Sequence, residues 1–178
     1  PISLDHHYRF LVLLARKSDP NIEATRHYFG RLMNGELYYR GIELRRHDYP
    51  DFLKAFELKL MDILLDARSS EEVLNRNFER ALGFVSESYE RVLKGEADFR
   101  SMVLSKVLNK NPFFYRSKFP HVSAAQLLTQ KGENVGPGSF IDFVYINAEH
   151  PNPLRRVLPS GMVNDDHLYY DCGKYAQM

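Results

Sequence analysis

Apolar residues in the first quarter of the chain occur in short runs that are typical of β-strands. Residues 8–15 form a continuous apolar run of strand length and predict a buried strand. The polar residues 16–24 predict a loop or turn after it. Two further runs, residues 26–33 and 36–42, are rich in Tyr, Phe and Leu and flank Asn34-Gly35, the strongest two-residue hairpin pattern. We therefore predict a strand, a loop and a β-hairpin.

Farther along the chain the apolar positions change to helical spacing. Residues 51–66 predict a helix whose apolar stripe is wide enough to be buried on more than one side. Ser69 and Glu72 form a capping box for a second helix that ends near Lys94. Its expected inner face consists of Leu74, Phe78, Ala81, Leu82, Val85, Tyr89 and Leu93. Because the link between the two helices is short and polar, we expect them to lie antiparallel.

The remainder of the chain alternates short strands with helices. We predict strands at residues 102–108 and 140–146, a helix at 122–130, an irregular proline-containing stretch at 150–160 and a last helix at 165–176. The order of elements predicts the α+β fold class, in which strands and a hairpin contribute to a sheet and are followed by a mainly helical part with a few short strands.

Charge is distributed unevenly along a chain whose formal net charge is only +1. Residues 49–98 hold 11 acids and 7 cations, a net of −4, whereas residues 99–132 hold six cations and no acid. An even distribution of the 23 acids would place about four in that segment. The segment therefore carries an uncompensated positive field, which suits a polyanion.

Aromatic residues are interleaved with these cations. The interleaved residues are Phe113, Phe114, Tyr115, Arg116, Lys118 and Phe119. This pattern is equally compatible with nucleic-acid binding and with an aromatic cluster that faces the core beside solvated charges. A helix that begins near Pro120 would add free N–H groups, which favour phosphate.

Composition restricts the cell compartment and the kinds of site that we expect for this chain. Hydrophobic residues make up 44% of the chain, which supports a packed core. A single cysteine, Cys172, excludes an internal disulfide and a cysteine-rich metal site and fits a reducing setting, so we expect a cytoplasmic protein. The sequence contains no apolar run of membrane-spanning length, and its start lacks the basic head of a signal peptide. Pro1 fits a natural start after removal of an initiator methionine.

A series of motifs runs through the chain. It comprises Arg26-His27-Tyr28-Phe29-Gly30, Arg40-Gly41-Ile42-Glu43, Arg45-Arg46-His47-Asp48, Tyr115-Arg116, Pro120-His121-Val122 with Ala124-Ala125, and GENVGPGSFIDFVY at residues 132–145. The series resembles the C-terminal part of archaeal-type family B DNA polymerases, covering the last palm strands and most of the thumb. The resemblance implies a palm end at residues 1–48 and a thumb at residues 49–178.

The resemblance also implies residues that contact DNA. In the family, a lysine run followed by Tyr grips the primer–template duplex, and a basic-Gly-x-Glu element approaches the 3′ end of the primer. The expected DNA-binding residues here are Arg26, His27, Tyr28, Gly30, Arg40, Gly41, Arg45, Arg46, Tyr115, Arg116, Lys118 and His121. Thr25 replaces the first lysine of the run, and His27 is a weaker cation near neutral pH, which softens the expected grip.

Motifs that are absent define the expected partners. Family members hold Mg²⁺ with a D-x-x-S-L-Y-P-like and a Y-x-D-T-D-like motif, and neither occurs here, nor does the lysine-bearing fingers helix. We expect no catalytic residue and no cofactor in this chain, with Mg²⁺ in the catalytic palm of a partner. The expected partners are a primer–template duplex and a larger polymerase subunit carrying exonuclease, fingers and catalytic palm. An unpaired sheet edge within residues 1–48 would meet that subunit.

Two other functions remain open. A stand-alone basic nucleic-acid-binding adaptor explains the charge segregation equally well, although it does not explain the order of the motifs. A self-contained metal-dependent hydrolase would need ligands from His6-His7 or Asp165-Asp166-His167. Adjacent side chains on a strand or helix point apart, so neither group makes a metal site unaided.

Structural roles are alternatives for several of the expected site residues. Arg45 and Arg46 can form ion pairs with Glu43 and Asp48, His121 can cap its helix, and Tyr28 can pack under the hairpin.

Overall fold

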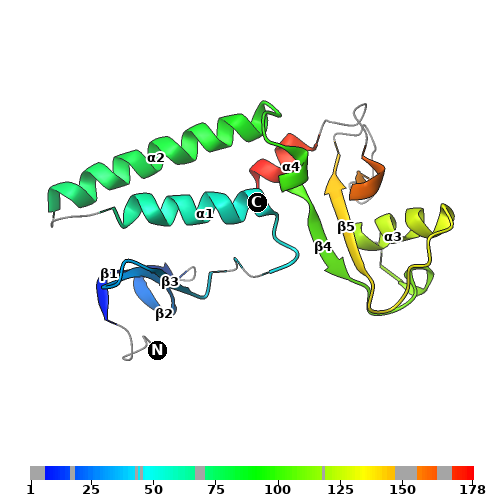
Figure 1. Cartoon of the computed structure of the whole chain (residues 1–178), viewed down its shortest axis with the longest axis horizontal. Helices are drawn as coiled ribbons and strands as arrows, with labels where there is room; N and C mark the ends of the chain where they lie inside the picture. Colours follow the sequence, from blue (N-terminus) through cyan, green and yellow to red (C-terminus); the bar gives the residue numbers. More distant parts are fainter. Residues whose placement is uncertain are drawn as a thin grey trace. The chain divides into compact units, whose positions relative to one another are not determined.

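A computed structural model describes residues 7–16, 19–42, 44, 46–66, 71–117, 119–146, 156–163 and 170–178. The chain has the expected α+β fold, with helices and two antiparallel sheets (Figure 1). It forms two compact units, one of Pro1–Leu44 with Phe56–Val85 and one of Arg45–Ala55 with Ser86–Met178. The predicted boundary between a palm end and a thumb at residue 48 stays a prediction. None of the helices in the described residues is long and apolar enough to cross a membrane.

The sheet of the first unit has the strand order β1-β2-β3. Strands β1 (Tyr8–Arg16), β2 (Asp19–Leu32) and β3 (Leu37–Arg40) pair antiparallel. The predicted first strand and the hairpin are therefore confirmed. The loop predicted at residues 16–24 is wrong, because β2 begins at Asp19 and pairs with Arg16. Pairing with a neighbouring strand outweighs the polar local sequence there.

The hairpin turn is longer than the pattern predicts. Leu32 N–H donates to the Glu36 carbonyl at 2.9 Å, and Gly35 N–H donates to the Leu32 carbonyl at 3.0 Å. These bonds close a three-residue loop rather than the two-residue loop expected from Asn34-Gly35. Gly35 has a φ of 89°, and a left-handed residue at this position is typical of such loops.

The core of the first unit lies between the sheet and helix α1 (Asp51–Leu64). Phe29 of β2, Leu44, Met61 of α1 and Leu65 are buried there in one cluster. Each fully buried side chain of this size stabilises the fold by roughly 1.5–3 kcal/mol relative to exposure. The cluster therefore anchors the hairpin to the helix.

Helices α1 and α2 (Glu71–Leu93) lie antiparallel, as predicted (Figure 1). Their contact includes the rings of Phe56 and Phe84, which stack with centroids 5.2 Å apart. The end of α2 also agrees with the prediction, since Gly95 follows with a φ of 73°. The predicted capping residue Ser69 lies outside the described residues.

The inner face predicted for α2 is buried at Ala81 and wrong at five other positions, and the side chain of Leu74 lies outside the described residues. Phe78, Leu82, Val85, Tyr89 and Leu93 are 37–59% exposed. Among residues 75–93 the buried positions are Asn77, Ala81 and Val92, and Phe84 and Ser88 of the same face are partly buried. The two sets are neighbouring halves of one wide apolar arc. Helix α1 and the second-unit core cover the half that begins with the small polar Asn77, whose amide donates to the Asp66 carbonyl at 2.9 Å.

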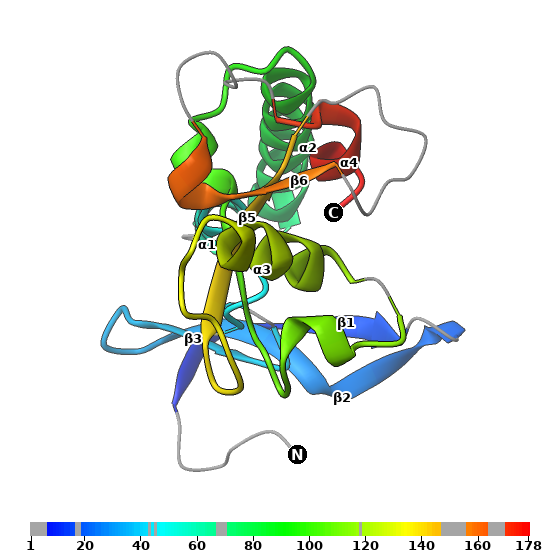
Figure 2. The same cartoon turned by 90° about the vertical axis from the view of Figure 1, so that its right-hand side faces the viewer.

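The second unit is built around the sheet β4-β5-β6 (Figure 2). Strands β4 (Leu104–Val107), β5 (Phe140–Tyr145) and β6 (Val157–Pro159) pair antiparallel, and helix α3 (Pro120–Gln130) contacts β5 and β6. Short 3₁₀ turns occur at Phe99–Met102, Pro112–Phe114 and Ser160–Met162. The strand predictions at 102–108 and 140–146 and the helix at 122–130 are confirmed. Strand β6 corrects the end of the irregular stretch predicted at 150–160, because Val157 pairs with Tyr145, whereas residues 150–155 lie outside the described residues.

The C-terminal segment corrects the last prediction. The helix expected at residues 165–176 is only the short α4 (Cys172–Ala176) within the described residues. Tyr170 instead forms a β-bridge with Ile146, and Asp171 then caps α4 by accepting the Lys174 N–H at 2.9 Å. A cap that follows a bridged residue allows the helix to begin only after it.

Candidate nucleic-acid interface

Two of the expected DNA-contacting motifs meet at one end of the hairpin. Arg26 and His27 are exposed on β2, and Arg40 lies opposite Tyr28 at the end of β3. Gly41 follows with a φ of 73°, and a Cβ built there would collide with the Arg26 carbonyl oxygen and lie 2.7 Å from the His27 ring. Glycine is therefore required where the chain passes β2. The close approach brings Arg26, His27 and Arg40 together at one end of the hairpin.

Tyr28 occupies a different environment from its charged neighbours. Its side chain is fully buried, and its ring lies 6.4 Å from that of Tyr8 and 6.2 Å from that of Tyr38. Burial and a hydrogen bond to Tyr28 raise the pKa of Tyr8 to about 12, so the Tyr8 hydroxyl is neutral. Gly30 is also buried within β2. We correct the expectation for Tyr28: its side chain supports the hairpin and is not presented at the surface.

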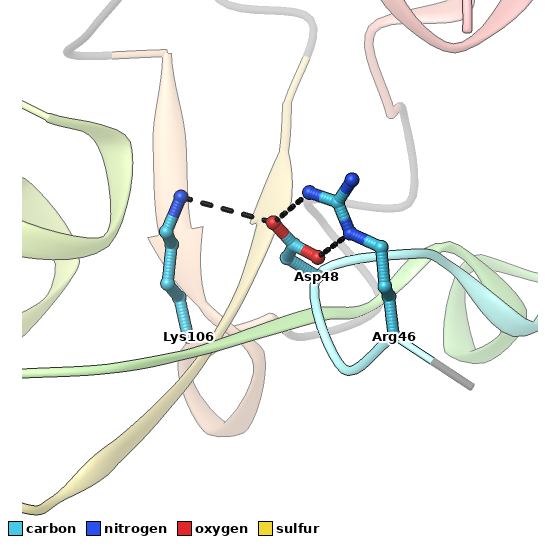
Figure 3. A network of polar contacts seen from close by, with 3 residues as sticks. All are labelled: Arg46, Asp48 and Lys106. Atoms are coloured by element: carbon cyan, nitrogen blue, oxygen red, sulfur yellow. Dashed lines mark hydrogen bonds and ion pairs between the residues drawn. The ribbon is translucent and has the colours of Figure 1, made fainter. Parts of the chain in front are cut away.

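Arg46 is held by a carboxylate in the second unit (Figure 3). Its Nε donates to Asp48 Oδ1 and its Nη2 donates to Asp48 Oδ2, both at 2.7 Å. Lys106 Nζ of β4 lies 3.8 Å from Asp48 Oδ2. Hydrogen bonding to Arg46 is the largest effect that lowers the pKa of Asp48. The structural ion pair left open by the sequence is therefore present, and the three groups together keep one net positive charge.

The loop after β4 carries a second group of cations and rings. Lys110 Nζ lies 4.9 Å from the centroid of the Tyr115 ring, a cation–π distance. The Tyr115 hydroxyl accepts the Asn109 N–H at 2.9 Å, which fixes the ring below the loop. Arg116 follows and is exposed. Tyr115 therefore organises the loop, and Lys110 and Arg116 supply its charge.

His121 departs from the expected role. It is only 7% exposed, at the start of α3, and its ring stacks on Phe119 with centroids 5.9 Å apart. Burial, and secondarily the charge of Lys106, lowers its pKa, so the imidazole is neutral at neutral pH. We correct the expectation for His121: it is a packed residue at the helix start and presents no cation to a ligand.

The remaining assignments divide between the two units. Arg26, His27, Arg40 and Gly41 are brought together in the first unit, whereas Arg46, Tyr115 and Arg116 belong to the second. Arg45 and Lys118 lie outside the described residues. Lys106 and Lys110 belong to the six cations of the acid-free segment but were not among the expected DNA-binding residues. The acid-free stretch at 99–132 was the signal that contained both.

Mg²⁺ finds no ligand set in the described part of this chain. No three His, Cys, Asp or Glu side chains come together among the described residues. The two candidate ligand groups of the hydrolase hypothesis lie outside them, apart from the exposed His7. We derive no chemical step through a metal held by these residues.

The fold is of the α+β class and carries exposed cations in both units, and the comparisons with known proteins give the family. The family model for DNA polymerase family B matches residues 2–176. The chain therefore belongs to DNA polymerase family B.

Several of the relatives come from archaea. The chain is 30% identical over 129 residues to "DNA polymerase 2" of Aeropyrum pernix, covering 72% of this chain and 15% of that protein. It is 25% identical over 164 residues to "DNA polymerase" of Archaeoglobus fulgidus, covering 92% of this chain and 19% of that protein. The chain thus spans less than a fifth of the length of these curated relatives.

A solved structure shares the fold. The family B DNA polymerase of Pyrobaculum calidifontis superposes with a TM-score of 0.74 at 24% identity, covering 98% of this chain and 20% of that chain.

Proposed function

We propose that this chain is the duplex-gripping part of a family B DNA polymerase, with a palm end at residues 1–48 and a thumb at residues 49–178. The observation that carries the proposal is the family match across residues 2–176. Exposed cations in both units support it, since a polymerase must hold a duplex without reading its sequence. Contacts to the phosphate backbone meet that requirement.

The mechanism that we propose is positional. Arg26 and Arg40 would contact phosphates near the primer terminus, where the Gly41 approach holds them together. Arg46, Lys106, Lys110 and Arg116 would contact phosphates of the duplex from the second unit. Each neutralised phosphate releases counterions, so binding should weaken as salt rises, with a slope of about 0.9 per contact.

The bond-forming chemistry is assigned to a partner chain. We propose that Mg²⁺, which polarises phosphates in such reactions, is held by carboxylates of a larger subunit with the catalytic palm, fingers and exonuclease. The absence from this sequence of both carboxylate motifs and of the fingers helix supports this assignment. Strand β1 lies at the edge of the first-unit sheet, where another strand can pair.

Duplex binding tests the gripping role. Fluorescence anisotropy with a labelled hairpin duplex should show binding in dilute buffer that weakens steeply with salt. Arg26→Gln, Arg40→Gln and Arg116→Gln should each reduce the salt slope by about 0.9. Arg76→Gln is the matched control, because Arg76 is exposed on α2 within the acidic segment. Absence of duplex binding by the wild-type chain would contradict the proposal.

Primer extension tests the division of labour. The purified chain should extend no primer alone and should restore extension when mixed with a co-purified polypeptide that carries both carboxylate motifs. Duplex binding without any stimulated extension would favour the stand-alone adaptor. Extension by the purified chain alone would overturn the assignment of chemistry to a partner.

A further inference from the structure

Two exposed phenylalanines stand out in the loop between β4 and α3. Phe113 is 53% exposed and Phe114 is 72% exposed. Within the described part of the chain, neither ring has an aromatic ring contact. A large apolar side chain left in water forgoes roughly 1.5–3 kcal/mol of burial, so two adjacent ones suggest a surface that is covered by a ligand.

The pair is held in place rather than carried by a loose loop. Pro112 is fully buried beneath them, and its carbonyl accepts a hydrogen bond from the Gln126 amide of α3 at 3.0 Å. The side-chain oxygen of Asn111 accepts the Phe113 N–H at 2.9 Å. The backbone carbonyl of Asn111 accepts the Phe114 N–H at 3.0 Å. Anchoring of this kind keeps the backbone ordered before binding, which lowers the entropy cost of association.

The charge around the pair indicates the class of ligand. Lys110 and Arg116 flank it, and neither forms an ion pair with the residues that the structure describes. The nearest acids in sequence are Asp98 and Glu133, at the two ends of the acid-free stretch. The carboxylate of Asp48, next to strand β4, is engaged by Arg46 and Lys106. An apolar protein surface has no need of such cations, whereas a nucleic acid carries phosphates for the cations and ring faces for the phenylalanines.

The aromatic rings distinguish between forms of nucleic acid. Bases inside a duplex are stacked on one another and present no free ring face. Unpaired bases do present one, and aromatic side chains bind them by stacking while cations follow the backbone. We propose that Phe113 and Phe114, flanked by Lys110 and Arg116, form a stacking site for unpaired bases of single-stranded nucleic acid. This inference rests on the proposed DNA-binding function and adds a second form of DNA to it.

The test compares two probes on the full chain. Binding of a labelled oligothymidylate of about twelve nucleotides and of a labelled hairpin duplex is measured by anisotropy across a salt series. The double variant Phe113→Ala/Phe114→Ala should lose at least about 25-fold in affinity for the oligothymidylate, about fivefold for each stacked base. Its duplex affinity and both salt slopes should stay unchanged, because no charge is removed.

A matched control separates stacking from general loss of apolar surface. Phe78→Ala/Leu82→Ala removes two similarly exposed side chains from α2 and should leave both affinities unchanged. Far-UV circular dichroism checks that each variant is folded. An unchanged oligothymidylate affinity in the Phe113→Ala/Phe114→Ala variant, or equal losses on both probes, would overturn the stacking site while leaving duplex gripping intact. Failure of the wild-type chain to bind either probe would overturn both proposals.

Discussion

The hydroxyl of Tyr170 donates a hydrogen bond to the backbone carbonyl of Val92 at 3.0 Å, joining residues that lie 78 positions apart. The same hydroxyl accepts the Ala97 N–H at 3.2 Å. Tyr170 is 2% exposed, so both bonds are shielded from water. A single side chain thereby ties the C-terminal segment to the end of α2 within the second unit.

Removing this hydroxyl should destabilise the fold. Tyr170→Phe leaves the ring in place but deprives the Ala97 N–H of its acceptor, which should lower the free energy of unfolding by about 1–3 kcal/mol. Urea denaturation followed by circular dichroism measures the change. Tyr89→Phe is the control, since Tyr89 is exposed on α2 and its substitution should stay within about 0.5 kcal/mol. Equal effects of the two substitutions would contradict this role of Tyr170.

Two glycine substitutions should change stability in opposite directions. Gly41→Ala forces a Cβ onto the Arg26 carbonyl at a positive φ and should destabilise the first unit by at least about 1–2 kcal/mol. Gly83 lies in α2 with open space around it, so Gly83→Ala should stabilise the chain by about 0.4–1 kcal/mol. Thermal unfolding of both variants measures the difference, and a neutral Gly41→Ala would count against the close approach.

A buried and an exposed apolar side chain give a third contrast. Met102 is fully buried in the second-unit core. Met102→Ala should therefore lower the free energy of unfolding by about 2–5 kcal/mol. Leu82→Ala on α2 should cost less than about 1 kcal/mol, because the side chain is already 52% exposed. Chemical denaturation of the isolated chain compares the two. A large loss of stability in Leu82→Ala would support the inner face that the sequence periodicity predicts.

Acidification should remove the contribution of Asp48. The Arg46 guanidinium lowers the pKa of this carboxyl in the folded chain, so the folded state favours the charged form. The resulting stability is complete above the ordinary Asp pKa of about 3.9 and is lost as the pH falls through the lower folded pKa. Asp48→Asn should therefore be less stable than the wild type at pH 7, with a difference that shrinks below about pH 4.

Unfolding free energies measured from pH 7 to strongly acidic conditions check the expectation for Asp48. Lys106→Gln is the comparison, because its longer 3.8 Å contact predicts a smaller pH-dependent difference. A gap between wild type and Asp48→Asn that grows on acidification would refute the sign of the effect.

The local sequence pattern was sufficient to predict which residues meet at the cationic end of the hairpin. Asn34-Gly35 placed residues 26–33 opposite residues 36–42, and that pairing alone brings Arg26 near Gly41. Pattern was insufficient for Tyr28 and His121, which lie beside charged residues in sequence. Their burial depends on partners far along the chain or on the opposite strand, such as Tyr8 and Tyr38 around Tyr28.

Helix α2 shows most clearly what the local sequence determines and what only the tertiary structure determines. Its spacing of apolar residues and the glycine after it decided that a helix forms and where it ends, because backbone hydrogen bonding and capping act within a few residues. The same spacing offered an arc of about half the helix circumference, and only contact with α1 and the second-unit core decided which half is covered. Ala81 and Val92 allow close approach there, while Phe78 and Leu82 remain in solvent.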